Sequence, residues 1–328
     1  MKKNALKAMC AALAGTVIVA GSLLPAPTAQ AAKSYTIAFI PGVAGDAYYG
    51  SLGCGIQAVA AQQGAKVVTQ APRSFDPVAQ IPILNAVVAQ HPDAIVIAPT
   101  DSKALIAPLR AAAAAGIKIV LADTTLDDTS FAAAEVSADN KEAGAVAGRA
   151  LADLLHGRSG SVITVNLSPG VTTTDAREVG FADVMKATKG IEYLPQQFSN
   201  NSVQKADQIV SSTALAKPNL VGVFSTAAFN TEGTVAALRA TGKTKDVIVV
   251  GFDANPPGID QLRKGTVAAQ VVLKPYDEGR DAAEQALNAL NGRAVTKKTL
   301  TTSVVATREN LDQPDVKRYI YSFECPAS

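Results

Sequence analysis

Tryptophan is absent from the 328-residue sequence, histidine occurs only twice, and aromatic residues make up 5% of the chain. His91 and His156 each stand at the predicted end of a helix, where a positive charge is favourable. No Ser-His-Asp set, Cys-His pair or metal-ligand cluster can be assembled from the local spacing. The scarcity of histidine leaves paired carboxylates as the remaining route to an enzyme, and we expect no metal and no cofactor.

Phosphate-binding glycine motifs are also missing. The tripeptide 242–244 (GKT) resembles the end of a P-loop, but Ala237 stands where that motif needs glycine, and the tripeptide follows a predicted helix. No G-x-G-x-x-G follows the first predicted strand. The formal net charge is only +2, so the sequence has no electrostatic footprint for nucleic acid, and none is expected as a partner.

The N-terminus is typical of an export signal. Lys2, Lys3 and Lys7 precede an apolar run over residues 9–24, prolines break it, and residues 29–31 (AQA) give a small-x-small cleavage pattern. The run is short for a membrane span of about 20 residues. We therefore predict a signal peptide over residues 1–31, cleaved before Ala32, and a periplasmic mature chain; an uncleaved anchor is the alternative.

Cysteine is rare, with three residues in the sequence. Cys10 lies inside the apolar run, whereas Cys54 and Cys325 stand near opposite ends of the exported part. An isolated pair in an oxidising compartment favours a disulfide. A redox or metal pair is the alternative, but it lacks a C-x-x-C spacing or a histidine companion. We predict a Cys54–Cys325 disulfide that ties the C-terminal tail to the first helix.

After the signal, short runs rich in Val and Ile alternate with longer Ala-rich stretches. Such runs are typical of buried parallel strands, and the alternation indicates βαβ units. The predicted strands are 35–40, 66–70, 94–98, 118–122, 161–166, 192–197, 220–225, 247–252 and 268–273. The predicted helices are 47–63, 77–90, 103–115, 140–155, 174–188, 202–217, 230–241, 258–264 and 275–291. The rhythm pauses at 127–138 and then restarts, which predicts two successive doubly wound α/β lobes.

Candidate ligand contacts follow the strands, because ligands of such sheets bind beyond the carboxyl ends of the strands. Tyr48 and Tyr49 open a helix, and we expect at least one ring to face a cleft and stack on a sugar ring. Asp123 and Asp253 each follow a strand, one in each lobe, and can accept hydrogen bonds from hydroxyls. Arg177 lies one turn inside a helix and offers a planar fork of donors. Charge-assisted hydrogen bonds of this kind are stronger than neutral ones.

Several segments together resemble the ribose/galactose-type periplasmic binding proteins, the type I solute receptors of ABC sugar importers. They are 46–49 (DAYY), 97–102 (IAPTDS), 139–140 (DN), 176–180 (AREVG), 251–253 (GFD) and 274–276 (KPY), in that order along the chain. The resemblance implies two parallel-sheet lobes joined by a three-stranded hinge near 137–139, 273 and 300–302. It implies ligand-binding roles for Tyr48, Tyr49, Asp123, Arg177 and Asp253. Further candidates are Thr124, Asn201, Thr226 and Asn230.

The implied domain boundaries are a signal peptide at 1–31, an N-terminal lobe of 32–137 plus 274–300, and a C-terminal lobe of 138–273 plus 301–315. Residues 316–328 form a tail that returns to the first lobe. The sequence departs from the family at Ala98, Thr124 and Leu273, where members often carry longer polar residues. These departures predict a ligand other than ribose, such as a deoxy sugar or a small polyol.

The resulting expectation is a monomeric, non-enzymatic receptor that closes on a monosaccharide or small polyol and delivers it to the membrane permease of an ABC importer. One alternative is a receptor for a sugar-like signalling molecule in chemotaxis or quorum sensing. A transcription regulator of the same shape would need a DNA-binding headpiece where the export signal stands. An exported sugar-processing enzyme would need two carboxylates, such as Asp123 and Asp253, to face one bond.

Overall fold

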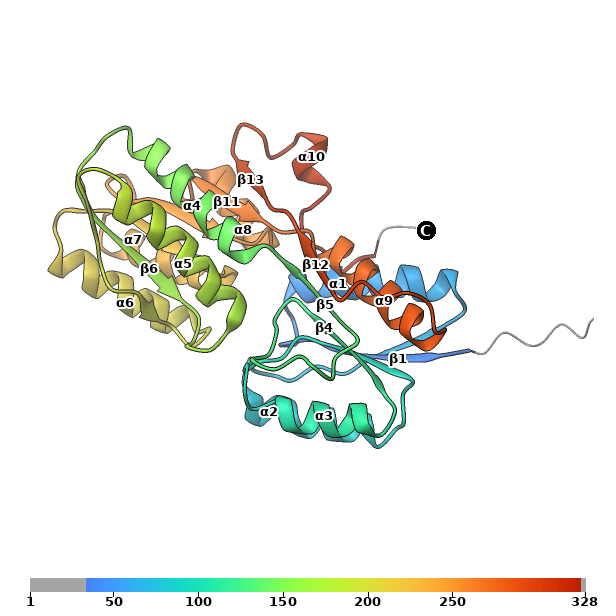
Figure 1. Cartoon of the computed structure of the whole chain (residues 1–328). Coiled ribbons are helices and arrows are strands. Elements are labelled where there is room, and N and C mark those ends of the chain that lie inside the picture. Colours follow the sequence, from blue (N-terminus) through green and yellow to red (C-terminus); the bar gives the residue numbers. More distant parts are fainter. Residues whose placement is uncertain (1–33, 326–328) are drawn as a thin grey trace, which may run out of the picture. The chain divides into compact units, whose positions relative to one another are not determined.

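The structure is a computed structural model that describes residues 34–325, and it contains two separate β-sheets (Figure 1). The predicted signal peptide and its cleavage site lie outside the described residues. Within residues 34–325, no helix is both long and apolar enough to cross a membrane.

The first lobe is built on a six-stranded parallel sheet in the order β12-β5-β4-β3-β1-β2. Its strands are β1 (Thr36–Ile40), β2 (Lys66–Thr69), β3 (Ala94–Ile97), β4 (Lys118–Ala122), β5 (Ala134–Ala138) and β12 (Lys298–Thr301). Its helices are α1 (Ala47–Gln62), α2 (Pro77–Val88), α3 (Ile106–Ala114) and α9 (Pro275–Leu290). The last helix and strand come from the far end of the sequence, so the chain returns to this lobe after building the second one.

Alternate residues of these strands serve opposite faces of the sheet, because side chains in a strand have a period of two. Ile40 and Ile95 pack with Leu84 and Leu109 of α2 and α3. Phe39, Val96 and Val120 belong to a different cluster, which includes Leu52 of α1 and Ala282 of α9. Both faces are therefore buried, which explains the continuous apolar runs in the sequence.

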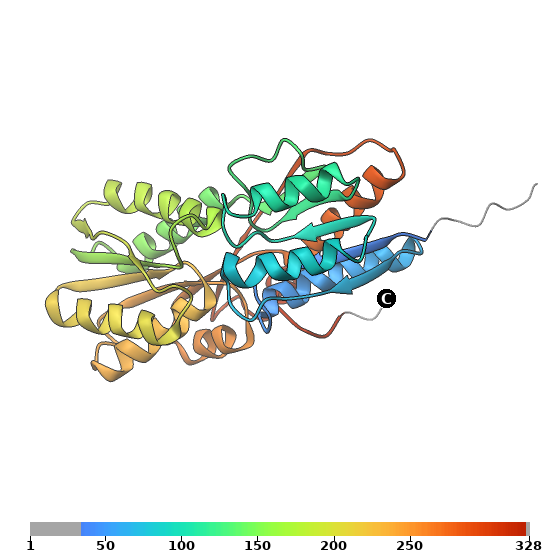
Figure 2. The same cartoon turned by 90° about the horizontal axis from the view of Figure 1, so that it is seen from below.

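The second lobe is built on a seven-stranded sheet in the order β13-β11-β10-β9-β6-β7, with β8 also paired to β6. Only β13 runs antiparallel to its neighbour β11. Its strands are β6 (Gly160–Asn166), β7 (Ile191–Tyr193), β8 (Gln197–Phe198), β9 (Leu220–Ser225), β10 (Ile248–Phe252), β11 (Ala269–Val272) and β13 (Val304–Thr307). Its helices are α4 (Asn140–Leu155), α5 (Thr172–Ala187), α6 (Val203–Ala216), α7 (Ala228–Ala240) and α8 (Pro256–Lys264). Figure 2 shows α4 and α5 on one face of this sheet and α6 to α8 on the other.

Three short segments carry the chain between the lobes: 137–139, which is the end of β5 and the residue before α4, 273–274 between β11 and α9, and 302–303 between β12 and β13. They are bonded to one another. The N–H of Asp139 donates to the carbonyl of Thr301 at 2.9 Å. Lys274 Nζ donates to Thr302 Oγ1 at 2.7 Å. The predicted three-stranded hinge of a two-lobed α/β fold is therefore present.

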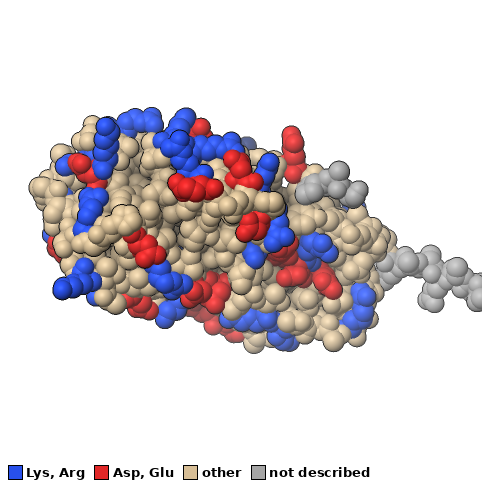
Figure 3. Space-filling model, turned by 90° about the horizontal axis from the view of Figure 1, so that it is seen from above, with Lys and Arg blue, Asp and Glu red and all other residues tan. Residues whose placement is uncertain are grey.

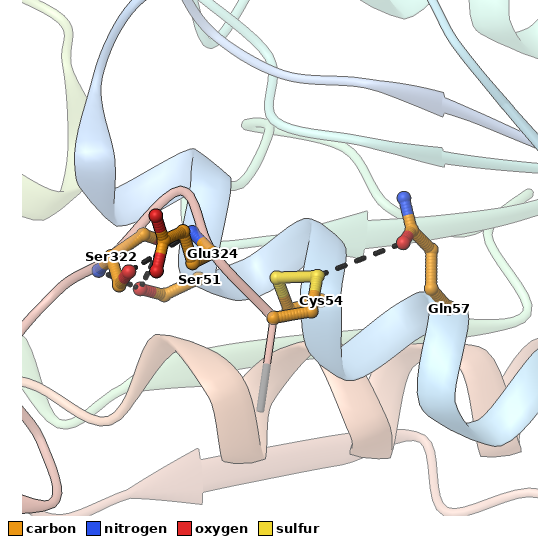
Figure 4. The surroundings of a disulfide bond; sticks show 6 residues. Ser51, Cys54, Gln57, Ser322 and Glu324 are labelled. Carbon is orange, nitrogen blue, oxygen red and sulfur yellow. Dashed lines mark hydrogen bonds between the residues drawn. A yellow bond between two sulfur atoms is a disulfide. The ribbon is translucent and has the colours of Figure 1, made fainter. Parts of the chain in front are cut away.

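The C-terminal tail forms a further link. After α10 (Pro314–Lys317), it runs back to α1, where Ser322 N donates to Ser51 Oγ at 2.8 Å. The expected disulfide between Cys54 and Cys325 is present, with an S–S distance of 2.00 Å (Figure 4). It joins residues separated by 271 positions in the sequence.

Three predicted details differ from the structure. The pause at 127–138 contains β5, whose Glu135 and Ser137 interrupt the apolar pattern on which strand prediction relied. The single strand predicted at 192–197 is two short strands, because Pro195 between them lacks the N–H that a sheet requires. Strands β12 and β13 were not among the predicted strands, because the sequence analysis gave this region only as a hinge crossing near residues 300–302.

We predict that the paired substitution Cys54→Ser and Cys325→Ser lowers the melting temperature of the mature chain. A cross-link over so long a separation restricts the unfolded chain, and native disulfides contribute about 2–4 kcal/mol. At roughly 2–4 °C per kcal/mol the loss amounts to several degrees. Thermal unfolding measured by circular dichroism tests this, with reduced wild type as the matched comparison. An unchanged melting temperature in both samples would show that the disulfide adds no stability.

Candidate functional site

Two aspartates occupy equivalent places at the carboxyl ends of strands, Asp123 after β4 and Asp253 after β10. Both have left-handed backbones, with φ of 66° and 76°. The N–H of Asp123 donates to Val136 O and that of Asp253 to Val271 O, each at 2.9 Å. Non-glycine residues with positive φ are uncommon and are found at functional sites when the surrounding structure holds them there. The adjacent strands supply that restraint and aim both side chains beyond the ends of the sheets.

Arg177 lies on α5 and only 4% of its surface is exposed. Its Nε donates to Asn140 Oδ1 at 2.8 Å, and its Nη1 donates to the carbonyl of Thr226 at 2.9 Å. The guanidinium also lies 3.8 Å from the centre of the Phe252 ring. Three fixed contacts leave the side chain little rotational freedom, so its remaining donors are held in place before any ligand arrives.

Close packing of α4 on α5 sets the position of Arg177. A Cβ added at Gly144 would come within 1.9 Å of the carbonyl oxygen of Arg177, and one added at Gly180 within 1.9 Å of that of Lys141. The two helices can approach this closely only because both positions are glycine. The start of α4 can therefore bring Asn140 to the guanidinium.

A chain of hydrogen bonds connects Arg177 to the first lobe. Ser137 Oγ donates to the carbonyl of Asp123, Asn140 Nδ2 donates to Ser137 Oγ at 3.2 Å, and Asn140 Oδ1 accepts from Arg177. Ser137 lies in the first crossing segment. The positions of Asp123 and Arg177 are thus connected through one strand of the hinge.

Both predicted tyrosines are buried at the start of α1, with exposures of 6% and 7%. Tyr48 donates its hydroxyl to Glu278 Oε2 at 2.6 Å, and Tyr49 donates to Asp123 Oδ2 at 2.8 Å. The rings meet edge to face, with centres 5.2 Å apart. Their hydroxyls are already used within the protein, which leaves their ring surfaces as the part available to a ligand.

A hollow lies where these groups meet, and both lobes line it. The first lobe contributes Tyr48, Tyr49 and Asp123, and the second contributes Arg177, Asn201 and Asp253. Six of the nine predicted ligand-binding residues therefore share one hollow.

The other three predicted residues do not line this hollow. Thr124 donates to the carbonyl of Pro99 at 2.7 Å and faces a neighbouring hollow. Thr226 donates to Asn166 Oδ1 at 2.9 Å, and Asn230 donates to Val165 O at 3.0 Å. Thr226 and Asn230 are fully buried behind Arg177, where they support the residues that hold it. Their place after β9 suggested cleft contacts, but their side chains turn back toward β6.

Sequence reasoning missed several residues in or behind the hollow. Asp46 caps the N-terminus of α1, and it also lines the hollow. Phe75 lines the hollow and packs against Leu167, Val171 and Ala227 of the second lobe. Glu278 and Tyr321 stand behind Tyr48. For Asp46, the only signal in the sequence was an aspartate among mostly apolar neighbours. That pattern fits a helix cap and a ligand contact equally well.

Tyr321 brings the tail into the site. Its hydroxyl accepts from the N–H of Leu273 at 3.1 Å and donates to Asp253 Oδ1 at 3.2 Å. Asp253 Oδ2 accepts from the N–H of Ala228 at 3.1 Å. Both oxygens of Asp253 thus have protein donors, one of them from the tail that the disulfide anchors.

The buried carboxyl groups are hard to ionise. Burial raises the pKa of Asp123 to about 6, although Arg177 and the Tyr49 hydroxyl act in the opposite direction. Burial, with the charge of Asp253 added, raises the pKa of Asp46 to about 7. Burial likewise raises the pKa of Glu278 to about 7 and raises that of Asp253. These shifts are typical of functional sites.

Comparison with known proteins places the chain in a family. The sequence model of the periplasmic binding protein domain matches residues 37–294. The chain belongs to the periplasmic binding protein family. Members of this family are solute-binding proteins and not enzymes, so the chain is a solute-binding protein.

Among its relatives, the ribose import binding protein RbsB of Bacillus subtilis is 27% identical over 81% of this chain and 85% of that protein. A solved ABC transporter solute-binding protein from Agrobacterium vitis, bound with alpha-D-tagatopyranose, is 36% identical. The similarity extends over 88% of this chain and 100% of the Agrobacterium vitis chain, with a TM-score of 0.85. A carbohydrate transporter solute-binding protein from Agrobacterium radiobacter, in complex with D-arabinose, is 27% identical with a TM-score of 0.83 and covers 88% of this chain and 99% of that one. The type I fold of this binding protein is therefore established.

We predict that Asp46→Asn stabilises the ligand-free binding protein relative to wild type, and that this difference in stability increases as pH rises. A carboxyl whose folded pKa of about 7 exceeds its ordinary value of 3.8 contributes stability that is fully present below about pH 4 and is lost as pH rises through 7. Asparagine caps a helix as well as aspartate and stays neutral. The melting-temperature difference between Asp46→Asn and wild type should therefore grow between pH 5 and pH 8.

The matched control is Asp76→Asn, since Asp76 caps α2 through the N–H of Val78 and does not line the hollow. Its melting-temperature difference from wild type should stay constant over the same range. A constant difference for Asp46→Asn as well would show that Asp46 is not held in a costly charged state.

Proposed function

We propose that this binding protein is the exported receptor of an ABC importer and that it captures a monosaccharide or small polyol between its lobes. The observation that carries the proposal is the shared hollow, in which Arg177 and Asp253 of one lobe face Asp123 and Tyr49 of the other. The names of the relatives support it, because they describe sugar-binding and ribose-import proteins.

Each lining group has a role that suits a hydroxylated ring. The carboxylates of Asp123 and Asp253 accept hydrogen bonds from ligand hydroxyls, and Arg177 donates to ligand oxygens. The rings of Tyr48 and Tyr49 offer flat apolar surfaces to the C–H faces of the solute. Asn201, which has a left-handed backbone with φ of 56°, adds an amide from the second lobe.

Closure follows from the division of these contacts between lobes. Only when the lobes approach does the solute touch both sets, so binding shifts the population toward the closed arrangement. The crossing segments are the hinge. The lobes are taken as 32–137 plus 274–300 and 138–273 plus 301–315, with the tail from 316 returning to the first lobe.

Export through a signal peptide at 1–31 would deliver the chain to the periplasm, the compartment in which its disulfide persists. The partner of the loaded form is the membrane permease of the importer. Lys and Arg side chains are interspersed with Asp and Glu over the face drawn in Figure 3, which supports a role without nucleic acid. The receptor acts as a monomer.

The test is thermal unfolding of residues 32–328 against a panel of pentoses, hexoses, deoxy sugars and small polyols. A ligand at about 1,000 times its dissociation constant stabilises a protein by about 4 kcal/mol. At roughly 2–4 °C per kcal/mol this is a rise of about 8–16 °C. A rise with one class of compound supports the receptor, and no rise with any of them contradicts a sugar or polyol as the solute.

We predict that Arg177→Lys weakens binding of the best compound at least tenfold and that Arg177→Ala abolishes it. Lysine retains the charge but loses the planar fork, and a hydrogen bond to a charged group contributes about 1.5–3 kcal/mol. Arg149→Ala is the control, because Arg149 is an exposed residue of α4, paired with Glu142. Isothermal titration measures affinity, and circular dichroism checks folding. Wild-type affinity in Arg177→Ala would remove this residue from the site.

A further inference from the structure

The hollow carries unbalanced charge. Three carboxylates line it, those of Asp46, Asp123 and Asp253, against the single guanidinium of Arg177. With all four groups ionised, the lining has an excess of two negative charges. The carboxyl of Glu278 lies directly behind, bonded to Tyr48, and adds to the excess.

The one cation does not neutralise its surroundings fully. Two of the donors of Arg177 point to neutral oxygens, those of Asn140 and Thr226. Its positive charge is shared among Asp123, Asp253 and Glu278, all of which it influences. Buried carboxylates without compensation are costly and tend to take up a proton, so a positive charge brought by the ligand would favour their ionised forms and bind to them.

The carboxylates of Asp46 and Asp123 are positioned to receive that charge. Asp46 Oδ1 accepts from the N–H of Tyr48 and Asp123 Oδ2 accepts from Tyr49, at 2.9 and 2.8 Å. Among the described residues 34–325, the second oxygen of Asp46, Oδ2, has no protein donor, whereas the Asp123 carboxylate also interacts with the Tyr48 hydroxyl. Asp123 is 93% buried, given its exposure of 7%. A group that donates two or three hydrogen bonds could bind the free oxygen of Asp46 and bridge to the Asp123 carboxylate.

Aromatic rings beside these oxygens favour the same kind of group. Tyr48, Tyr49 and Phe75 all line the hollow. Ring faces attract cations through their quadrupoles, and the attraction grows when water is excluded. An ammonium between the Asp46 carboxylate and a tyrosine ring gains both interactions.

We propose that the solute is an amino sugar or amino polyol, whose protonated amine binds at Asp46 and Asp123 and whose hydroxyls bind at Arg177 and Asp253. This inference rests on the proposed receptor function and names the class of its solute. A neutral polyol offers hydroxyl donors to the same oxygens but leaves the excess negative charge in place. An ammonium supplies the donors and cancels charge together.

The experiment compares pairs of compounds that differ in one group. D-glucosamine, D-galactosamine and 1-amino-1-deoxy-D-sorbitol are titrated against residues 32–328 at pH 7, each beside its hydroxyl parent, D-glucose, D-galactose or D-sorbitol. The N-acetyl derivatives of the two hexosamines keep the nitrogen but remove its charge. At least one amine should bind ten times more tightly than both its parent and its acetylated form.

The variant Asp46→Asn then tests where the amine binds. The substitution keeps the helix cap and nearly the same shape while it removes one charge. Affinity for the preferred amine should fall at least tenfold, and affinity for its hydroxyl parent should fall much less, so that the preference for the amine is lost. Asp76→Asn, the equivalent cap of α2, should leave both affinities unchanged.

The outcomes separate this inference from the proposed function. Equal or tighter binding of the hydroxyl parents overturns the amine assignment and leaves the sugar receptor standing. If Asp46→Asn still binds the amine more tightly than its hydroxyl parent, the placement of the ammonium at Asp46 is wrong. If neither amines nor parents bind, while the wider panel of sugars and polyols also fails, the receptor function falls together with the inference.

Discussion

The arginine at position 177 is the group on which the site depends. It is buried, it is fixed by Asn140, by the Thr226 carbonyl and by the Phe252 ring, and it is the one cation among the carboxylates that line the hollow. Without it, Asp123 and Asp253 would face each other across the cleft with no opposite charge between them. The glycines that let α4 and α5 pack closely, the buried polar residues behind β6 and β9, and the hinge residue Ser137 all contribute to keeping this side chain in place.

The two lobes position their site aspartates, Asp123 and Asp253, in the same way. In each, a parallel strand ends at an aspartate with a left-handed backbone, and its N–H is bonded to the neighbouring strand. The ligand-facing side chain is therefore positioned by the sheet, a rigid element, rather than by a loop. The tail adds a third support, since Tyr321 bonds Asp253 and the hinge residue Leu273 together. The disulfide at Cys325 holds that tail against the first helix.

Much of this arrangement could be predicted from the sequence, because its main signals are local. Buried parallel strands appear as short apolar runs, and the strand-end residues Asp123 and Asp253 and the helix residue Arg177 follow from the strand pattern. The disulfide followed from having only two cysteines beyond the signal. What could not be predicted depends on side-chain direction. Thr226 and Asn230 have the right place after β9 but point back toward β6. Asp46 caps a helix and also lines the hollow, and no local pattern separates these roles. Strand β5 was missed because its polar residues alternate with apolar ones.

The central claim is that one small hydroxylated solute binds between the lobes and touches the buried arginine and the strand-end aspartates together. The most direct measurement is a crystal structure of residues 32–328 grown with the compound that stabilises the chain most. The account predicts the solute in the hollow lined by Tyr49, Asp123, Arg177 and Asp253, with a donor from Arg177 on one of its oxygens and a carboxylate of each lobe on its polar groups. A solute bound in the neighbouring hollow beside Thr124, or held by residues of one lobe alone, would contradict it.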